Sequence, residues 1–225
     1  LRNKISSFLK RPKTIGEFKK AQVIIWIERL EEAVVGSLLP VYEQLTQSGI
    51  KTQLISNKSS DFLPEDTLYF KSTTTVKRPA WKLEVWEKFI ELYPEISVRS
   101  IKRSFFASCN QLQGRFNELN RLLDAIKPEL IIDASTGLIG GAALIIASHK
   151  RKIMTLEIQH GLTQAFYTPV IADHIMTWGE SSNTTLKRLG VSEDKLITVG
   201  SSRHDSMIPM DNISDRKILL SSLSL

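Results

Sequence analysis

The 225-residue sequence contains a single cysteine, Cys109, and no long apolar run. One cysteine cannot build a disulfide framework within the chain, which fits a reducing compartment such as the cytosol. A helix that spans a bilayer needs about 18 consecutive apolar residues, and no stretch reaches that length. The N-terminal residues are basic but lack the apolar segment of a signal peptide. We therefore predict a cytoplasmic protein.

Several motifs with well-understood chemistry are also missing. The sequence has no P-loop, no G-x-G-x-x-G fingerprint, no G-x-S-x-G turn and no nucleic-acid motif. Its four histidines, at positions 149, 160, 174 and 204, lack the close spacing of a zinc site. We predict neither a metal ion nor a nucleic-acid partner.

Positive charge is concentrated at the start of the chain, whose formal net charge is +6. Residues 1–20 contain seven Lys or Arg and one acid, Glu17, while the remaining residues hold 23 charges of each sign. We predict a basic N-terminal helix or arm over residues 1–20. It is either a solvated segment or a segment attracted to anionic lipid or a phosphorylated acceptor. Attraction to lipid would place the protein at the inner face of the membrane.

Short apolar runs alternate with helical segments along most of the chain, which is 42% hydrophobic. The expected strands are 22–28, 51–56, 67–72, 129–135, 152–158, 174–179 and 195–200; the expected helices are 33–49, 79–93, 100–126, 138–150 and 181–190. This alternation is typical of βαβ units, which form a parallel sheet with helices on both faces. We predict an α/β fold, with a Rossmann-like, doubly wound parallel sheet over residues 21–210.

The end of the chain has a different pattern. Residues 211–225, DNISDRKILLSSLSL, resemble a linker followed by a new apolar strand, KILLSS, at 217–222. A buried strand needs neighbours on both sides. Since the chain also starts at Leu1 rather than Met, we expect the natural protein to be longer.

Polar residues follow several of the expected strands. Glu28 and Arg29 follow the first, the segment DASTGLIGG (133–141) follows the fourth, and Gln159-His160-Gly161 follow the fifth. Ligands of such folds bind beyond the carboxyl ends of the strands. Ser135, Thr136 and Gly137 are therefore candidates for an anion site at a helix N-terminus. The alternative is a helix cap whose glycines allow tight packing against the sheet.

His160 is the strongest single candidate for a catalytic residue. A neutral imidazole can accept a proton from a hydroxyl near neutral pH, which suits a general base. Gly161 has no side chain that would crowd a ligand. The alternative is a histidine at a strand end that is bonded to backbone.

Residues 157–205, EIQHGLTQAFYTPVIADHIMTWGESSNTTLKRLGVSEDKLITVGSSRHD, carry a resemblance to known enzymes. The features are Gln-His-Gly after a strand, then Pro169, Ala172-Asp173, Trp178-Gly179-Glu180, Leu189-Gly190-Val191, Lys195, Val199-Gly200, Arg203 and Asp205. In order and spacing this set resembles bacterial GT-B-type enzymes of surface-polysaccharide and teichoic-acid assembly. These include CDP-glycerol glycerophosphotransferase-like and capsule or lipopolysaccharide glycosyltransferase families. The match covers about residues 129–205.

The resemblance implies the N-terminal half of a GT-B fold, truncated at the first strand of the second half. Residues 21–210 would be the acceptor-side domain, and residues 211–225 would begin the missing nucleotide-binding domain. The whole enzyme would transfer a glycosyl or glycerophosphoryl group from a nucleotide-activated sugar or alditol donor to a cell-surface glycan or lipid-linked acceptor. It would need no metal or other cofactor. This piece alone would be inactive or nearly so.

The resemblance also implies roles for individual residues. His160 would deprotonate the attacking hydroxyl or contact the transferred group, with Gln159 and Gly161 beside the substrate. Ser201 and Arg203 would contact a phosphate. Three alternatives remain open: a nucleotide-sugar 2-epimerase-like GT-B enzyme, a non-catalytic accessory module that retains the half-fold, and a Rossmann-like domain of unrelated function.

Overall fold

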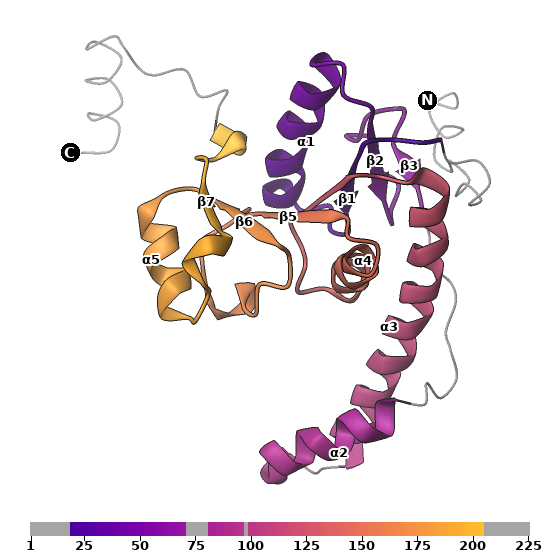
Figure 1. Ribbon diagram of the computed structural model, residues 1–225, viewed down its shortest axis with the longest axis vertical. Helices are drawn as coiled ribbons and strands as arrows, with labels where there is room; N and C mark the ends of the chain where they lie inside the picture. The colour runs from indigo at the N-terminus through magenta and orange to yellow at the C-terminus, as the bar shows by residue number, and fades with distance from the viewer. Residues whose placement is uncertain (1–18, 71–80, 97–98, 205–225) are drawn as a thin grey trace, which may run out of the picture.

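The computed structural model describes residues 19–70, 81–96 and 99–204 (Figure 1). Residues 1–18 of the predicted basic arm lie outside this part of the chain. The predicted linker and strand at 211–225 lie outside it as well.

The described chain forms one sheet of seven parallel strands in the order β3-β2-β1-β4-β5-β6-β7. The strands are β1 (Val23–Ile27), β2 (Thr52–Ser56), β3 (Leu68–Tyr69), β4 (Leu130–Asp133), β5 (Met154–Ile158), β6 (His174–Thr177) and β7 (Leu196–Thr198). All seven fall within the segments predicted as strands. The helices are α1 (Glu32–Gln47), α2 (Lys82–Leu92), α3 (Arg99–Ile126), α4 (Ile139–His149) and α5 (Glu180–Arg188).

Helices cover both faces of the sheet, because successive side chains of a strand point to opposite faces. On β1, Val23, Ile25 and Ile27 pack in the cluster that contains α1, whereas Ile24 and Trp26 pack with residues of α3 and α4. Figure 1 shows α1 on one side of the sheet and α4 and α5 on the other. Each fully buried Ile contributes roughly 1.5–3 kcal/mol through removal from water. The doubly wound parallel sheet is confirmed.

The strand order reverses between β1 and β4. The chain leaves β1 toward β2 and β3 on one side, and leaves β4 toward β5, β6 and β7 on the other. A crevice forms at such a switch point, beyond the carboxyl ends of the strands. Residues 28 and 29, which follow β1, and residues 134–138, which follow β4, lie at this point.

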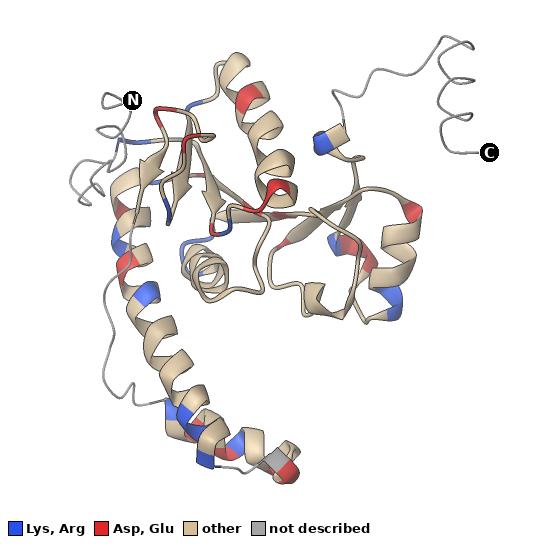
Figure 2. Ribbon diagram, turned by 180° about the vertical axis from the view of Figure 1, so that it is seen from behind, with Lys and Arg blue, Asp and Glu red and all other residues tan. Residues whose placement is uncertain are grey.

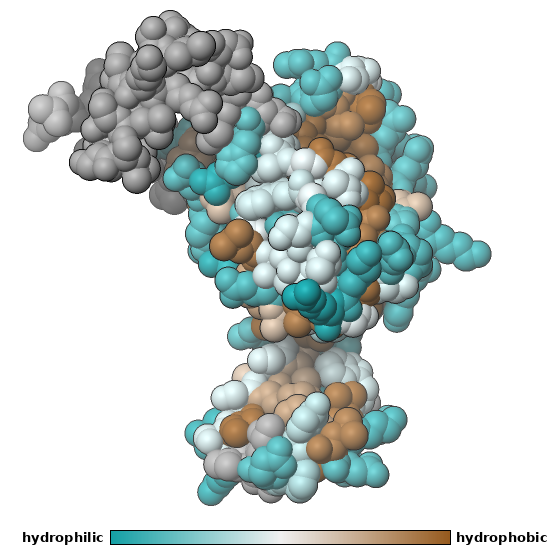
Figure 3. Space-filling view, turned by 90° about the vertical axis from the view of Figure 1, so that its left-hand side faces the viewer, coloured by the Kyte–Doolittle hydropathy of each residue, from teal (hydrophilic) through white to brown (hydrophobic). Residues whose placement is uncertain are grey.

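The far ends of α2 and α3 extend away from the sheet as a helical arm (Figures 1 and 3). Trp86 is 2% exposed and contacts the rings of Phe89, Phe105 and Phe106, which join the two helices. Charges of both signs are spread along these helices (Figure 2). The periodicity predicted both helices but not their projection from the domain.

No helix among the described residues is both long and apolar enough to cross a membrane. The 28-residue α3 has the length, but it carries charged side chains along it.

Candidate functional site

A pocket of about 210 Å³ opens beyond the carboxyl ends of β4 and β5. Its lining comes from three parts of the chain: Arg29 after β1, residues 134–138 after β4, and a third part in and after β5. The third part contributes Glu157 on β5, His160 after it, and Phe166 and Tyr167 of the short 3-10 turn η4 (Ala165–Tyr167). The lining residues are Arg29, Ala134, Ser135, Gly137, Leu138, Glu157, His160, Phe166 and Tyr167. The pocket therefore lies where a doubly wound fold binds its ligands.

The N-terminus of α4 beside this pocket already holds an anion from within the chain. The backbone N–H groups of Gly140 and Gly141 donate to the two carboxylate oxygens of Glu28, at 3.1 and 2.6 Å. Glu28 is 9% exposed, and the Arg115 guanidinium lies 3.8 Å from it. Glu28 thus takes the place that an external anion would occupy at these two amides. This arrangement matches the packing alternative for the glycines of segment 133–141, with Glu28 supplying the cap.

Two further carboxyl groups lie beside Glu28 on the α4 face of the sheet. Asp133 and Glu157 are direct neighbours across β4 and β5, and both are buried. Burial raises the pKa of Asp133 well above its ordinary value; the Ser135 amide opposes this shift, while Glu157 and Glu28 add to it. Burial also raises the pKa of Glu157 to about 7. Asp133 and Glu157 therefore hold their protons to a higher pH than exposed carboxyl groups do.

Glu157 is the member of this group that faces the pocket. One of its carboxylate oxygens accepts a hydrogen bond from the Thr136 hydroxyl at 2.7 Å. That bond favours the charged form and partly opposes the effect of burial on the pKa. Thr136, predicted as a ligand contact, thus acts on the side chain that lines the pocket.

His160 is held against Tyr167. The Tyr167 hydroxyl accepts hydrogen bonds from the backbone N–H groups of His160, at 3.2 Å, and Gly161, at 3.1 Å. It also lies 3.3 Å from the ring nitrogen Nδ1 of His160. Burial and then the positive charge of Arg29 lower the pKa of His160, whereas the Ile158 carbonyl and Glu31 act in the opposite direction. His160 is therefore a neutral imidazole at pH 7.

Gln159 serves as a clamp behind the pocket and is 1% exposed. Its amide oxygen accepts from the Trp178 N–H at 2.9 Å, and its amide nitrogen donates to the Gly161 carbonyl at 2.8 Å. The Trp178 indole N–H donates to the Gln159 carbonyl at 2.9 Å. The predicted substrate-binding amide is fully engaged within the protein, and it fixes the turn that carries His160.

Replacing Gln159 with alanine is expected to lower the free energy of unfolding by about 1–3 kcal/mol, because it leaves buried backbone partners without a hydrogen bond. Gln164→Ala is the matched control, since Gln164 is exposed and its side chain makes no cap hydrogen bond. Urea unfolding of both variants would measure the difference. Equal stability of the two would contradict the clamp.

Ser201 and Arg203 do not line the pocket. Arg203 belongs to the 3-10 turn η6 (Ser202–His204), which packs on α1. Its guanidinium lies 3.6 Å from Glu32, and the Ser202 hydroxyl donates to the Ser37 carbonyl at 2.7 Å. The structure places Arg203 beside α1, outside the lining of the pocket. The phosphate role of Ser201 and Arg203 stays a prediction.

The pocket brings together Ser135, Gly137 and His160 from the predicted set, and it adds residues that the sequence reasoning missed. The additions with polar chemistry are Arg29, Glu157 and Tyr167. The signal for Glu157 was an acidic residue inside a central strand, β5, whose only other polar residue is Thr155. Tyr167 had no comparable signal, because its role depends on a loop that folds back onto His160.

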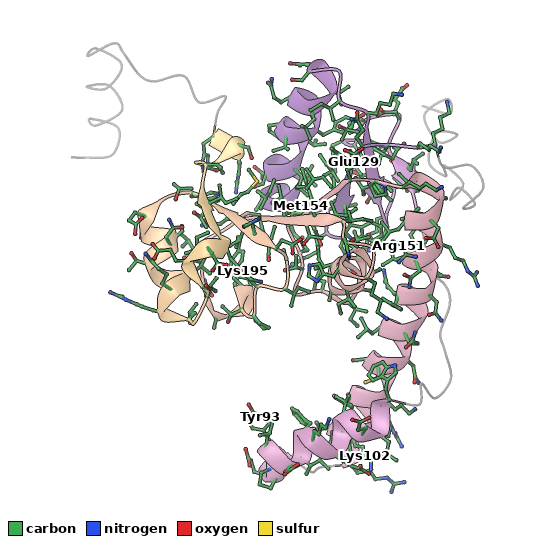
Figure 4. The ribbon with its side chains drawn as sticks, in the orientation of Figure 1. Tyr93, Lys102, Glu129, Arg151, Met154 and Lys195 are labelled. Atoms are coloured by element: carbon green, nitrogen blue, oxygen red, sulfur yellow. The ribbon has the colours of Figure 1, made fainter. Side chains whose placement is uncertain are left out.

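A larger hollow of about 650 Å³ lies at the other end of the strands from the pocket. It is lined by Glu129, His149, Lys152, Ile153, Met154, Asp173, His174, Asp194 and Lys195. Glu129, Met154 and Lys195 mark this region in Figure 4. It lies at the amino ends of the strands, where parallel sheets do not place their ligands. Across residues 19–70, 81–96 and 99–204, no three His, Cys, Asp or Glu side chains are grouped so that they could hold a metal ion.

No protein-family model matches the sequence, and no curated protein matches it significantly. Among solved structures, MurG from Acinetobacter baumannii is similar with a TM-score of 0.51 at 10% identity, over 85% of this chain and 47% of that chain. A UDP-N-acetylglucosamine 2-epimerase from Rickettsia bellii gives 0.46 at 14% identity, over 92% and 52% of the two chains. HepE from Anabaena, solved with UDP and glucose, gives 0.42 at 11% identity, over 90% and 50%.

The chain spans about half the length of these structures. Its α/β architecture, with a seven-stranded parallel sheet, matches about half of a GT-B-fold chain. The predicted similarity in fold to GT-B enzymes is therefore confirmed.

Proposed function

We propose that this chain is the N-terminal, acceptor-side domain of a bacterial transferase. The enzyme moves a glycosyl or glycerophosphoryl group from a nucleotide-activated donor to a cell-surface glycan or lipid-linked acceptor. The single observation that carries the proposal is the pocket at the switch point, where neutral His160 stands beside Glu157 in a half GT-B fold. The resemblance of residues 157–205 to polysaccharide and teichoic-acid transferases supplies the substrate class.

The dimensions of the pocket support a reacting group rather than a whole nucleotide. About 210 Å³ accommodates a hydroxyl-bearing unit of an acceptor together with the transferred group, and is below the range of ordinary cofactor sites, which is about 300–1,000 Å³. Arg29 lies on the lining with its guanidinium bonded to Glu31 at 2.7 Å, so one cation stands beside the reacting centre. Most contacts to the nucleotide would come from the other half of the enzyme.

The test uses the full-length natural protein with a panel of nucleotide-activated sugars and alditols, each with and without acceptor. His160→Ala is expected to lower kcat/KM for acceptor-dependent transfer by about 10²-fold or more. His149→Ala is the matched control, because His149 lies in the hollow at the other end of the strands from the pocket. Unfolding midpoints of both variants would show that the fold is retained.

Each alternative predicts a different result. Conversion of a nucleotide sugar without any acceptor would indicate an epimerase instead of a transferase. An unchanged biological output in the His160→Ala strain would favour a non-catalytic accessory module. Equal loss of activity in His149→Ala and His160→Ala would remove the special role of the pocket.

A further inference from the structure

We propose that Glu157, and not His160, removes the proton from the attacking hydroxyl. This inference rests on the proposed transfer function and assigns the general base within its pocket. The sequence-based expectation gave His160 two possible roles, as the base or as a contact to the transferred group, and the inference removes the first.

The position of Glu157 suits a proton acceptor. It sits on β5, a central strand, so the sheet fixes its backbone, and it is one of the residues that line the pocket. The Thr136 hydroxyl holds one carboxylate oxygen at 2.7 Å. Within the described part of the chain, no lysine, arginine or histidine forms an ion pair with Glu157. A carboxylate with no countercharge, held in place beside a pocket, is a stronger base than one paired with a cation.

The contacts of Tyr167 define the proton on His160. A tyrosine oxygen has two acceptor positions, and the N–H groups of His160 and Gly161 fill them. The Tyr167 hydroxyl hydrogen then remains for the third contact, which is His160 Nδ1 at 3.3 Å. Nδ1 is thus an acceptor, and the proton of the neutral ring sits on Nε2. The Ile158 carbonyl accepts a hydrogen bond from the ring and raises the pKa of His160. A ring in this tautomer has no free nitrogen for the substrate proton.

The charges around the two side chains agree with this division. Glu157, with a pKa of about 7, changes its charge in the range where a general base is most effective. Its acidic neighbour is Asp133 on β4, which keeps its proton to a higher pH than usual and is itself beside Glu28. Burial, and then the charge of Arg29, lower the pKa of His160. Tyr167, whose pKa burial raises, stays a hydroxyl donor.

With Glu157 as the base, every bond and proton of the transfer step is accounted for. The acceptor hydroxyl gives its proton to a Glu157 carboxylate oxygen while its own oxygen bonds to the transferred carbon or phosphorus. The bond from that atom to the nucleotide phosphate oxygen breaks, and its electron pair leaves with the nucleotide. His160 retains its proton throughout. Glu157 releases its proton to solvent afterwards.

The kinetic test compares the wild-type full-length protein with Glu157→Gln. The glutamine keeps the shape and the oxygen that accepts from Thr136, but it cannot take a proton. We expect kcat to fall by about 10²–10⁴-fold with the donor KM unchanged. The wild-type rate should rise with pH through about 7, and this rising limb of the pH–rate profile should be absent in the variant. Retention of the limb and of the rate in Glu157→Gln would overturn the assignment of the base.

Thr136→Val provides a readout that a purely structural role would not move. Valine has the same shape but removes the hydrogen bond that lowers the Glu157 pKa. The rising limb should therefore move to higher pH. An unmoved limb would show that another group produces it.

Nitrogen NMR of His160 tests the second half of the proposal without any activity. The expected pattern is a protonated Nε2 and an unprotonated Nδ1 in the wild type, with Nδ1–H becoming populated in Tyr167→Phe. A protonated Nδ1 in the wild type would leave Nε2 free to accept the substrate proton and would overturn the exclusion of His160 as the base. Acceptor-independent conversion by the wild type would overturn the transfer function and this step together, whereas transfer that survives Glu157→Gln overturns the inference alone.

Discussion

Gly141→Ala is expected to destabilise the protein by about 3 kcal/mol, as overpacking of a rigid site does. A Cβ at this position would lie 2.3 Å from the Asp133 carboxylate and 2.5 Å from the Ser135 carbonyl oxygen. The second of these atoms belongs to the backbone between β4 and α4, which cannot shift without moving the pocket wall. A helix interior normally favours alanine over glycine by about 1 kcal/mol, so the expected sign is opposite to the helix propensity.

Gly36→Ala is the matched control for this prediction. Gly36 lies within α1, and a Cβ there would meet the Arg203 side chain at 3.5 Å, an ordinary contact. It should be neutral or stabilise by up to about 1 kcal/mol. Chemical denaturation of both variants measures the contrast. Two variants with the same stability change would contradict the close packing of α4 on the carboxyl group of Asp133.

Glu157→Gln is expected to raise the stability of the folded protein above neutral pH while it lowers the rate of the proposed transfer. Folding raises the pKa of Glu157 from 4.5 to about 7. Between these values the unfolded chain has released the proton that the folded protein still binds, so the wild-type stability contribution falls as pH rises. The accumulated cost above pH 7 is about 3 kcal/mol, from the free energy per pKa unit. Glutamine has no proton to lose and avoids this cost.

The measurement is the difference in unfolding free energy between Glu157→Gln and wild type across the pH range. The difference should be smallest at pH 4.5, grow up to about pH 7 and then stay constant. Glu43→Gln, at an exposed position of α1, should stay within about 0.5 kcal/mol of wild type throughout. A pH-independent difference for Glu157→Gln would mean that its carboxyl group titrates normally. A gain in stability with a loss of turnover is the usual signature of a functional side chain.

Local sequence patterns were enough to predict the strands and helices of this domain. Val23–Ile27 is apolar at every position, as a strand buried on both faces must be, and Lys127 and Pro128 end the long helix α3. The same reasoning placed His160 directly after a strand, at the edge where ligands bind. It could not show that α2 and α3 project from the body, because periodicity reports which side of a helix is buried but not how far the helix extends beyond its neighbours.

The predicted anion site at the start of α4 shows most clearly what the sequence could not predict, namely the group that fills it. Glycines and small residues after β4 indicated that something negative or closely packed would meet the helix N-terminus, but the partner is Glu28, 112 and 113 positions earlier in the chain. Likewise, the pattern around Gln159 suggested a ligand contact, whereas its side-chain amide forms hydrogen bonds with the Trp178 N–H and the Gly161 carbonyl. Both outcomes depend on which strand lies beside which.

The sequence by itself determined the α/β alternation, the two-faced burial of the central strands and the histidine at the end of β5, because each depends on neighbouring residues and their spacing. Only the tertiary structure decided that Glu28 caps α4, that Tyr167 returns to hold His160, and that Glu157 faces the same pocket. These contacts form because the sheet order brings β1, β4 and β5 together at the switch point. That order is set by the packing of the whole domain, and no local stretch of sequence specifies it.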